Sequence, residues 1–151
     1  MRVTVAAVGR MKSGPERELL DRYLDRAAKQ GRALGVGRVE VREIAESRGA
    51  RADDRKAEEA AELLAGLADG AFVVALDERG AQMTSDAFAD MLRARLADGR
   101  DLAVLIGGAD GHGPAVAARA DLRLAFGAMT WPHQIVRILA AEQIYRATTI
   151  L

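Results

Sequence analysis

Residues 102–114 read LAVLIGGADGHGP and pass from an apolar run through paired glycines to a proline. The five consecutive apolar residues 102–106 predict a strand that is buried on both faces. Pro114 is typical of the first turn of a helix, where the N–H that proline lacks would have no intrahelical partner. The stretch therefore predicts a buried strand, a glycine turn and a short helix over 114–120, the βα unit of a parallel sheet.

The same alternation of strand and helix patterns extends in both directions from this stretch. Further strands are predicted at 2–8, 38–44, 71–76 and 122–126, and further helices at 16–29, 55–67, 86–96 and 132–148. The strand 38–44 alternates apolar and charged residues, which indicates a half-exposed place near the sheet edge. Asp77–Gly80 is predicted to be a turn, and Asp53 or Asp54 to cap the second helix. The alternation indicates an α/β fold, a mainly parallel sheet with helices on both faces.

Composition favours one domain over residues 1–151. The chain has 151 residues and is 50% hydrophobic, which is enough for a core without disulfide or metal staples. It contains no cysteine, which excludes thiolate catalysis and cysteine-ligated zinc, and its two histidines argue against a histidine-rich metal site. No apolar run reaches the ~18 residues of a membrane span, and the N-terminal run is too short for a signal peptide. We therefore expect a cytoplasmic protein with no metal and no membrane contact.

Charge is distributed unevenly, although 22 basic and 22 acidic residues give a net charge of zero. Residues 1–56 carry 14 Lys and Arg against 9 Asp and Glu, whereas residues 57–151 carry 8 against 13. Such asymmetry is compatible with a basic face that meets a polyanion. Solvated helix faces are the alternative explanation, and the charge counts alone do not decide between the two.

The helix predicted over 132–148 is apolar on nearly every side. The apolar residues on it and just beyond it are Ile135, Val136, Ile138, Leu139, Ala140, Ala141, Ile144, Tyr145 and Ile150. A helix that is apolar all round is buried all round, and one sheet face covers only part of it. We expect the remaining surface to meet a second copy in a homodimer. The alternative is a helix threaded deep inside one subunit.

Three predicted strands end in segments with features of a binding site: 76–78, 107–108 and 126–131. Ligands of open parallel sheets bind outside the carboxyl ends of the strands, so these segments converge if the strands are neighbours. The glycines let the backbone approach a ligand, and four side chains would form an apolar wall: Leu76, Phe126, Met129 and Trp131. Without a phosphate-binding lysine, such a cleft suits an adenosyl group better than a triphosphate. A tight strand-to-helix turn beside ordinary core residues, or the dinucleotide loop of an oxidoreductase, are alternatives.

Two residues at the start of the last helix are candidates for catalysis. His133 lies in the first turn, where backbone N–H groups disfavour an imidazolium, so a neutral ring could accept a proton. A capping or partner-contacting histidine is the alternative. Arg137, one turn further on, could hold a phosphate or the carbonyl of a base. His112, in the glycine turn, is expected to be exposed and is given no role. We expect the protein mainly to position two bound molecules.

Two segments carry a family resemblance: LIGGADG at 105–111 and LAFGAMTWPHQIVRILAAEQIYRA at 124–147. Together they closely resemble the small bacterial SPOUT-class methyltransferases, which methylate a pseudouridine of large-subunit (23S) ribosomal RNA at N3. The segments VAAVGRMK at 5–12 and LDERG at 76–80 fit the same family. The resemblance covers essentially the whole chain.

The resemblance implies an α/β fold with a C-terminal trefoil knot, formed by about residues 71–151. It implies a homodimer with the last helix in the interface. S-adenosylmethionine would be the methyl donor, bound by matching motif at Leu76, Gly107, Phe126, Gly127, Ala128, Met129, Thr130 and Trp131. The implied reaction is methyl transfer to N3 of a pseudouridine in the ribosomal RNA of the assembled ribosome.

Family chains usually continue past the last helix into a short tail containing His-Pro-Tyr-His, which helps to form the substrate side of the site. This sequence stops at Leu151. The alternative function is therefore a knotted, ribosome-associated module that binds a nucleoside without turnover.

Overall fold

A single sheet of five parallel strands forms the centre of the molecule, with the order β2-β1-β4-β3-β5. The computed structural model describes all residues from 1 to 151. The strands are β1 (Arg2–Val8), β2 (Arg38–Ile44), β3 (Phe72–Ala81), β4 (Leu102–Ile106) and β5 (Leu122–Leu124). The prediction of a mainly parallel sheet is confirmed, and β2 lies at its edge with mostly half-buried residues, as its alternating pattern indicates.

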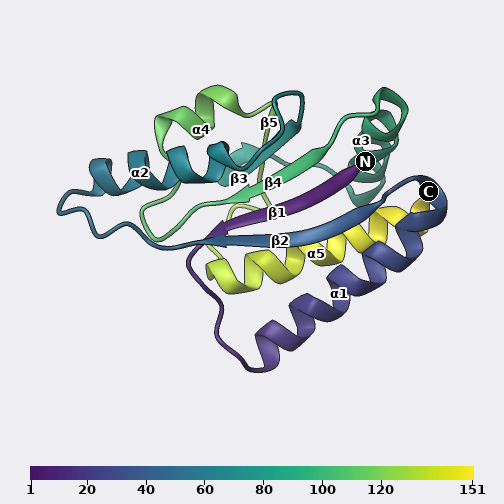
Figure 1. Cartoon of the computed structure of the whole chain (residues 1–151), viewed down its shortest axis with the longest axis horizontal. Helices are drawn as coiled ribbons and strands as arrows, with labels where there is room; N and C mark the ends of the chain where they lie inside the picture. Colours follow the sequence, from purple (N-terminus) through teal and green to yellow (C-terminus); the bar gives the residue numbers. More distant parts are fainter.

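Helices cover both faces of the sheet, as predicted (Figure 1). They are α1 (Pro15–Gly31), α2 (Ala52–Ala65), α3 (Ser85–Asp98), α4 (Pro114–Arg119) and α5 (His133–Ile150), with a 3₁₀ turn η1 (Arg32–Leu34) after α1. Apolar residues of α1, α3 and α5 share one core cluster, and those of α2 and α4 share a second cluster on the other face. The sheet is therefore the middle layer of three.

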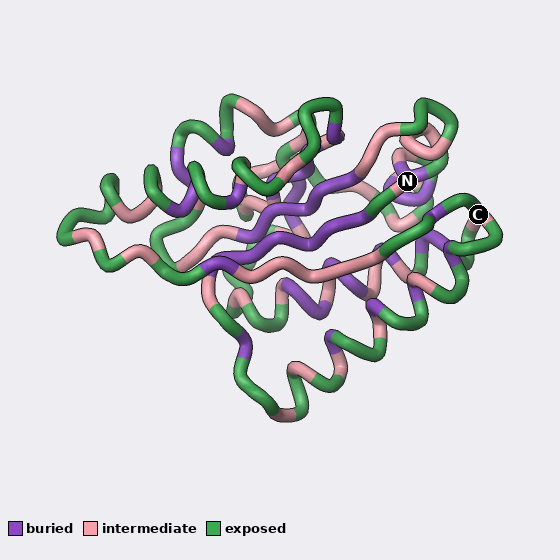
Figure 2. Tube along the Cα trace, viewed as in Figure 1, coloured by how far each residue is buried: buried purple, intermediate pink, exposed green.

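The central strands supply residues to both cores. Along β1, Val3, Val5 and Ala7 belong to one cluster, whereas Ala6 and Val8 belong to the other. All five residues of β4 are buried, and Figure 2 shows β1 and β4 as the most continuously buried part of the trace. Because each buried Val, Leu or Ile contributes about 1.5–3 kcal/mol, these strands fix the position of the loops at their ends.

Two local predictions are wrong. The predicted turn at 77–80 is part of β3, which runs to Ala81 and shifts its pairing with β5 between Leu76 and Ala81. The second helix begins at Ala52 after Arg51, and no side chain caps it. Asp53 and Asp54 lie inside its first turn, where their charges favour the positive end of the helix dipole without capping it.

The last helix, α5, packs against α1 and α3 as well as against the sheet. Ile138, Ala141 and Ile144 are buried within the subunit because of these flanking helices, while Ile135 and Ile150 remain 36% and 41% exposed. The expectation that a single sheet face covers this helix is therefore wrong, and the apolar surface left over is smaller than expected. No helix of the chain has the length and apolar character needed to cross a lipid bilayer.

Candidate functional site

The carboxyl ends of β3, β4 and β5 meet at one edge of the sheet, because the three strands are parallel neighbours. Residues 76–79 of β3 and the segments that follow β4 and β5 border a cleft of about 610 Å³. That volume lies within the range of roughly 300–1,000 Å³ that is usual for small-molecule sites. The sequence prediction that these three loops converge is thus confirmed by the order of the strands.

The cleft brings together most of the predicted donor-site residues. Those that line it are Leu76, Gly107, Phe126, Gly127, Met129, Thr130 and Trp131, whereas Ala128 is not among the lining residues. Met129 is 75% exposed and Trp131 is 44% exposed, so these two side chains are not part of the hydrophobic core. Their binding roles stay a prediction, but the alternative of ordinary core packing is excluded.

One wall of the cleft is the glycine loop, which comprises residues 107–113. Gly108 and Gly111 form an isolated antiparallel bridge, and Gly111 N donates to Gly108 O over 3.0 Å. A Cβ atom on Gly107 would lie 2.9 Å from the carbonyl carbon of Gly111, so no larger residue fits this turn. The glycines therefore close a tight turn and expose backbone to the cleft at the same time.

The opposite wall is the tryptophan loop, which comprises residues 125–132. Thr130 Oγ1 donates to Glu78 Oε2 over 2.6 Å, and Trp131 Nε1 donates to Phe126 O over 3.3 Å. The first bond ties the loop to β3, and the second closes it on itself. Two adjacent strand ends thus hold the exposed indole in place over the cleft.

A charged pair that the sequence reasoning missed lies between these walls. Arg123 Nη2 donates to Asp77 Oδ2 over 2.5 Å, and both residues line the cleft. Burial raises the pKa of Asp77, but the hydrogen bonds from Arg123 and from the Arg79 N–H outweigh burial, so the pKa is lowered. Asp77 therefore stays an anion at the edge of the site. The two partners are 46 residues apart and come from different strands, so no local pattern could reveal them.

His112 is half-buried, so the expectation that it is exposed is wrong. Its Nε2 lies 3.2 Å from the carbonyl oxygen of Leu105, an acceptor, so this nitrogen carries the proton and donates. Its Nδ1 is buried without a partner. Burial lowers the pKa of His112, against the raising effects of the Leu105 bond and the Asp77 charge. Burial therefore favours the neutral ring, which lines the cleft as part of the glycine loop.

The two predicted catalytic candidates have different positions. His133 lines the cleft at the start of α5 and is partly exposed. Arg137 is 1% exposed and does not line the cleft. Its Nη1 donates to Glu43 Oε2 over 2.7 Å, and its Nη2 donates to Val8 O over 2.7 Å. Arg137 therefore connects α5 to the end of β1, and its guanidinium forms an ion pair with Glu43.

The fold and the cleft define an α/β protein with a glycine-walled site at the carboxyl edge of its sheet. A family model described as "Predicted SPOUT methyltransferase" matches residues 1–151. The chain belongs to this family of methyltransferases.

Relatives over the full chain agree with this assignment. The chain is 59% identical to "Ribosomal RNA large subunit methyltransferase H" of Brucella anthropi and 56% identical to the protein of the same name from Rhizobium leguminosarum bv. trifolii. Each match covers 100% of this chain and 95% of the relative. Among solved structures, the SpoU methyltransferase AviRb of Streptomyces viridochromogenes, in complex with the cofactor AdoMet, matches with a TM-score of 0.42 and 12% identity. This match covers 97% of the chain and 59% of AviRb.

Proposed function

We propose that the protein transfers a methyl group from S-adenosylmethionine to N3 of a pseudouridine in large-subunit ribosomal RNA, within the assembled ribosome in the cytoplasm. The observation that carries the proposal is the single cleft that Leu76, Gly107 and Trp131 share, although Leu76 lies in β3, Gly107 follows β4 and Trp131 follows β5. The printed names of the relatives support ribosomal RNA as the substrate class.

The residues of the cleft fit S-adenosylmethionine. The adenosine would lie between the glycine loop, whose backbone is accessible at Gly107, and the apolar side chains Leu76, Met129 and Trp131. The lining also contains three acidic side chains (Asp77, Glu78 and Asp110) and three basic ones (Lys56, Arg79 and Arg123), which can meet both the carboxylate and the ammonium group of the donor. When bound, S-adenosylmethionine supplies an electrophilic methyl group on a positively charged sulfur. The proposed donor site comprises Leu76, Gly107, Phe126, Gly127, Ala128, Met129, Thr130 and Trp131.

The chain would contribute mainly orientation to the reaction. Transfer forms a bond from N3 to the methyl carbon, breaks the bond from sulfur to that carbon, and releases the N3 proton to a base. His133 lines the cleft and is the candidate for that base, because an imidazole can accept a proton near neutral pH. Arg137 acts as a positioning residue in this proposal, since its guanidinium is turned toward Glu43 and Val8.

We also propose that residues 1–151 form one domain, that about residues 71–151 are knotted, and that two copies associate through α5. The return of α5 from β5 to pack against β1 and α1 supports the knot. The exposed Ile135 and Ile150 support the interface. Stretching a knotted chain by its two ends would give an unfolded length shorter than 151 residues at about 3.3–3.6 Å per residue.

Calorimetry and a methylation assay test the function. S-adenosylmethionine and S-adenosylhomocysteine should bind one site per chain, whereas NAD and ATP should bind weakly or not at all. Ribosomes should then accept a radiolabelled methyl group on a pseudouridine. Binding without any transfer would support the nucleoside-binding module instead, and binding of NAD alone would support the oxidoreductase. Full turnover by His133→Ala with intact donor binding would remove His133 from the mechanism.

A further inference from the structure

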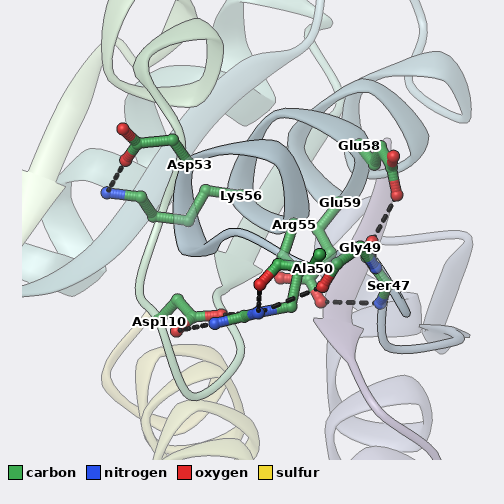
Figure 3. A network of polar contacts seen from close by, with 9 residues as sticks. All are labelled: Ser47, Gly49, Ala50, Asp53, Arg55, Lys56, Glu58, Glu59 and Asp110. Carbon is green, nitrogen blue, oxygen red and sulfur yellow. Dashed lines mark hydrogen bonds and ion pairs between the residues drawn. The ribbon is translucent and has the colours of Figure 1, made fainter.

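Arg55, near the start of α2, connects two segments that are far apart in the sequence. Its Nε donates to Asp110 Oδ2 over 2.7 Å, and its Nη2 donates to Asp110 Oδ1 over 3.2 Å. Its Nη1 donates to the carbonyl oxygens of Gly49 and Ala50 over 3.1 and 3.3 Å. Figure 3 shows the guanidinium between Asp110 and these two carbonyls. One side chain thus contacts both the glycine loop and the arginine loop, which comprises residues 45–51.

The pairing with Asp110 is the only side-chain hydrogen bond or ion pair that the tip of the glycine loop makes outside itself. Ala109 and Gly111 have no polar side chain, and Asp110 accepts from no residue other than Arg55. The bidentate geometry restricts both the position and the orientation of the carboxylate, which a single-point contact cannot do. The conformation of the loop tip therefore depends on Arg55 more than on any other side chain.

The base of the glycine loop packs closely against α2. A Cβ atom on Gly113 would lie 2.6 Å from the carbonyl oxygen of Lys56, so backbone meets backbone directly. A Cβ atom on Gly108 would lie 3.4 Å from Oε1 of the buried Glu59. The base of the loop is thus fixed by close contact with α2, and its tip is fixed by Arg55.

The arginine loop is held from the other side by the same helix. Ser47 N donates to Glu59 Oε2 over 3.0 Å, and Ser47 Oγ donates to Glu58. Figure 3 shows these contacts on the same stretch of α2 as Arg55. The Ser47 contacts therefore hold the arginine loop in place, and the Gly49 and Ala50 carbonyls of this loop in turn orient the Arg55 guanidinium. The whole arrangement, from Ser47 through Arg55 to Asp110, is one continuous polar network.

We propose that Arg55 is a positioning residue for the methyl donor, which holds the glycine loop in its binding shape by clamping Asp110 against the arginine loop. The inference rests on the proposed function, because the glycine loop is a wall of the proposed donor site. Arg55 does not line the cleft, whereas Asp110 does, so Arg55 acts through Asp110 and not by touching the donor. By ordering the glycine loop before the donor binds, Arg55 reduces the conformational entropy that the loop loses on binding.

Titration with S-adenosylhomocysteine tests the clamp in the full chain. Arg55→Met should weaken binding about tenfold, because two charge-assisted hydrogen bonds that order the loop are lost. Arg55→Lys should lie between this variant and the wild type, because an ammonium is a point donor that cannot bind both Asp110 oxygens and both carbonyls. The control is Arg93→Met, which removes the exposed Arg93–Asp90 pair on α3 and should leave the affinity unchanged.

Two further measurements separate positioning from general stabilisation. Affinities of Arg55→Met, Asp110→Asn and the double variant should be non-additive, with the double variant no weaker than the weaker single variant. S-adenosylhomocysteine has no net charge, yet its affinity for the wild type should fall as salt rises, since the clamp is partly exposed. That salt dependence should disappear in Arg55→Met, whereas a loss of global stability would leave it in place.

The outcomes of these titrations are distinguishable. If the wild type binds S-adenosylhomocysteine and Arg55→Met, folded by circular dichroism, binds it equally well, the clamp is wrong and the proposed function stands. Additive losses with an unchanged salt dependence would also overturn the clamp. If the wild type binds neither S-adenosylhomocysteine nor S-adenosylmethionine, the proposed function fails and the clamp fails with it.

Discussion

His112 shows how burial of a single residue makes the fold sensitive to pH. Burial lowers its pKa in the folded protein, while the nearby Asp77 charge opposes this change and the Arg123 charge adds to it. Between the folded value and the ordinary value of 6.5, the unfolded chain binds more protons than the folded chain. The contribution of His112 to stability is therefore complete above pH 6.5 and is lost as the pH falls below it.

We predict that His112→Gln removes this part of the pH dependence. The free energy of unfolding of the wild type, measured in urea, should fall between pH 7.5 and 5, and that of the variant should fall less. Both proteins should lose stability below pH 4.5, because the pKa of Glu43 and that of Asp77 are lowered by folding. Equal slopes above pH 5 would show that His112 is not the group responsible.

Substitution of Gly113 tests the close packing of the glycine loop against α2. Its φ of −77° suits any residue, so the obstacles to Gly113→Ala are the approach of the added Cβ to the Lys56 carbonyl oxygen, at 2.6 Å, and to the Ala60 Cβ, at 3.2 Å. We predict a loss of about 1–3 kcal/mol in the free energy of unfolding, and weaker binding of S-adenosylhomocysteine, because backbone must move. The matched control is Gly70→Ala, where nothing lies within 4 Å of the added Cβ and stability should hardly change.

At the scale of residues, the sequence predicts those site residues whose type is itself distinctive after a strand, such as glycine and tryptophan. Gly107 and Trp131 are recognisable because paired glycines and an isolated aromatic follow predicted strands. The pairs Asp77–Arg123 and Arg55–Asp110 cannot be recognised in the sequence, because the two residues of each pair are 46 and 55 positions apart. Only the tertiary fold brings the partners together, and a single Asp or Arg in a sequence is otherwise typical of solvated surface.

At the scale of elements, α5 is joined to the rest of the fold by a partly buried charge network. Glu43, on β2, accepts hydrogen bonds from Met11 N, Arg17 and Arg137 over 2.6–2.7 Å. Burial raises the pKa of Glu43, but these bonds and the charges of Arg17 and Arg137 outweigh it, so the pKa is lowered. The network connects the start of α5 with β2 and with the segment that joins β1 to α1.

We predict that Arg137→Met destabilises the protein by about 1–3 kcal/mol, because it removes one of the two cations paired with Glu43 and leaves the buried Val8 carbonyl without its donor. Urea unfolding measures this loss. Lys29→Met is the control: it removes an exposed ion pair with Asp25 and should cost less than about 1 kcal/mol. A loss of that small size in Arg137→Met would contradict the structural role.

The elements that the sequence predicts well are those with a strong local pattern. β4, with five apolar residues, has the predicted bounds, and so does β2, with its alternation. The segment 77–80 contains polar residues and a glycine, which is typical of a turn. The residues on either side of it, Leu76 and Ala81, both pair with Leu124 of β5. This pairing is a long-range interaction, and such tertiary contacts override local propensity without leaving a local signal.

At the scale of the whole molecule, the three-layer arrangement leaves two apolar side chains of α5 exposed. α1 and α3 pack against α5 and bury most of its apolar residues, whereas Ile135 and Ile150 remain exposed. The two residues are 15 positions apart, which places them about 22 Å apart along a helix. An isolated exposed isoleucine is ordinary, but two on the outer surface of one helix fit a two-fold contact between copies.

We predict that the protein sediments as a dimer and that Ile135→Asp separates the subunits. In a two-fold interface each substitution occurs twice, and a carboxylate placed against apolar surface loses its hydration without gaining a partner. The dissociation constant from sedimentation equilibrium should therefore rise by at least about a hundredfold. The control Ala57→Asp adds the same charge at an exposed position on α2, across the sheet, and should leave the dimer intact. A wild type that stays monomeric at every concentration, or a dimer that Ile135→Asp does not weaken, would exclude α5 as the interface.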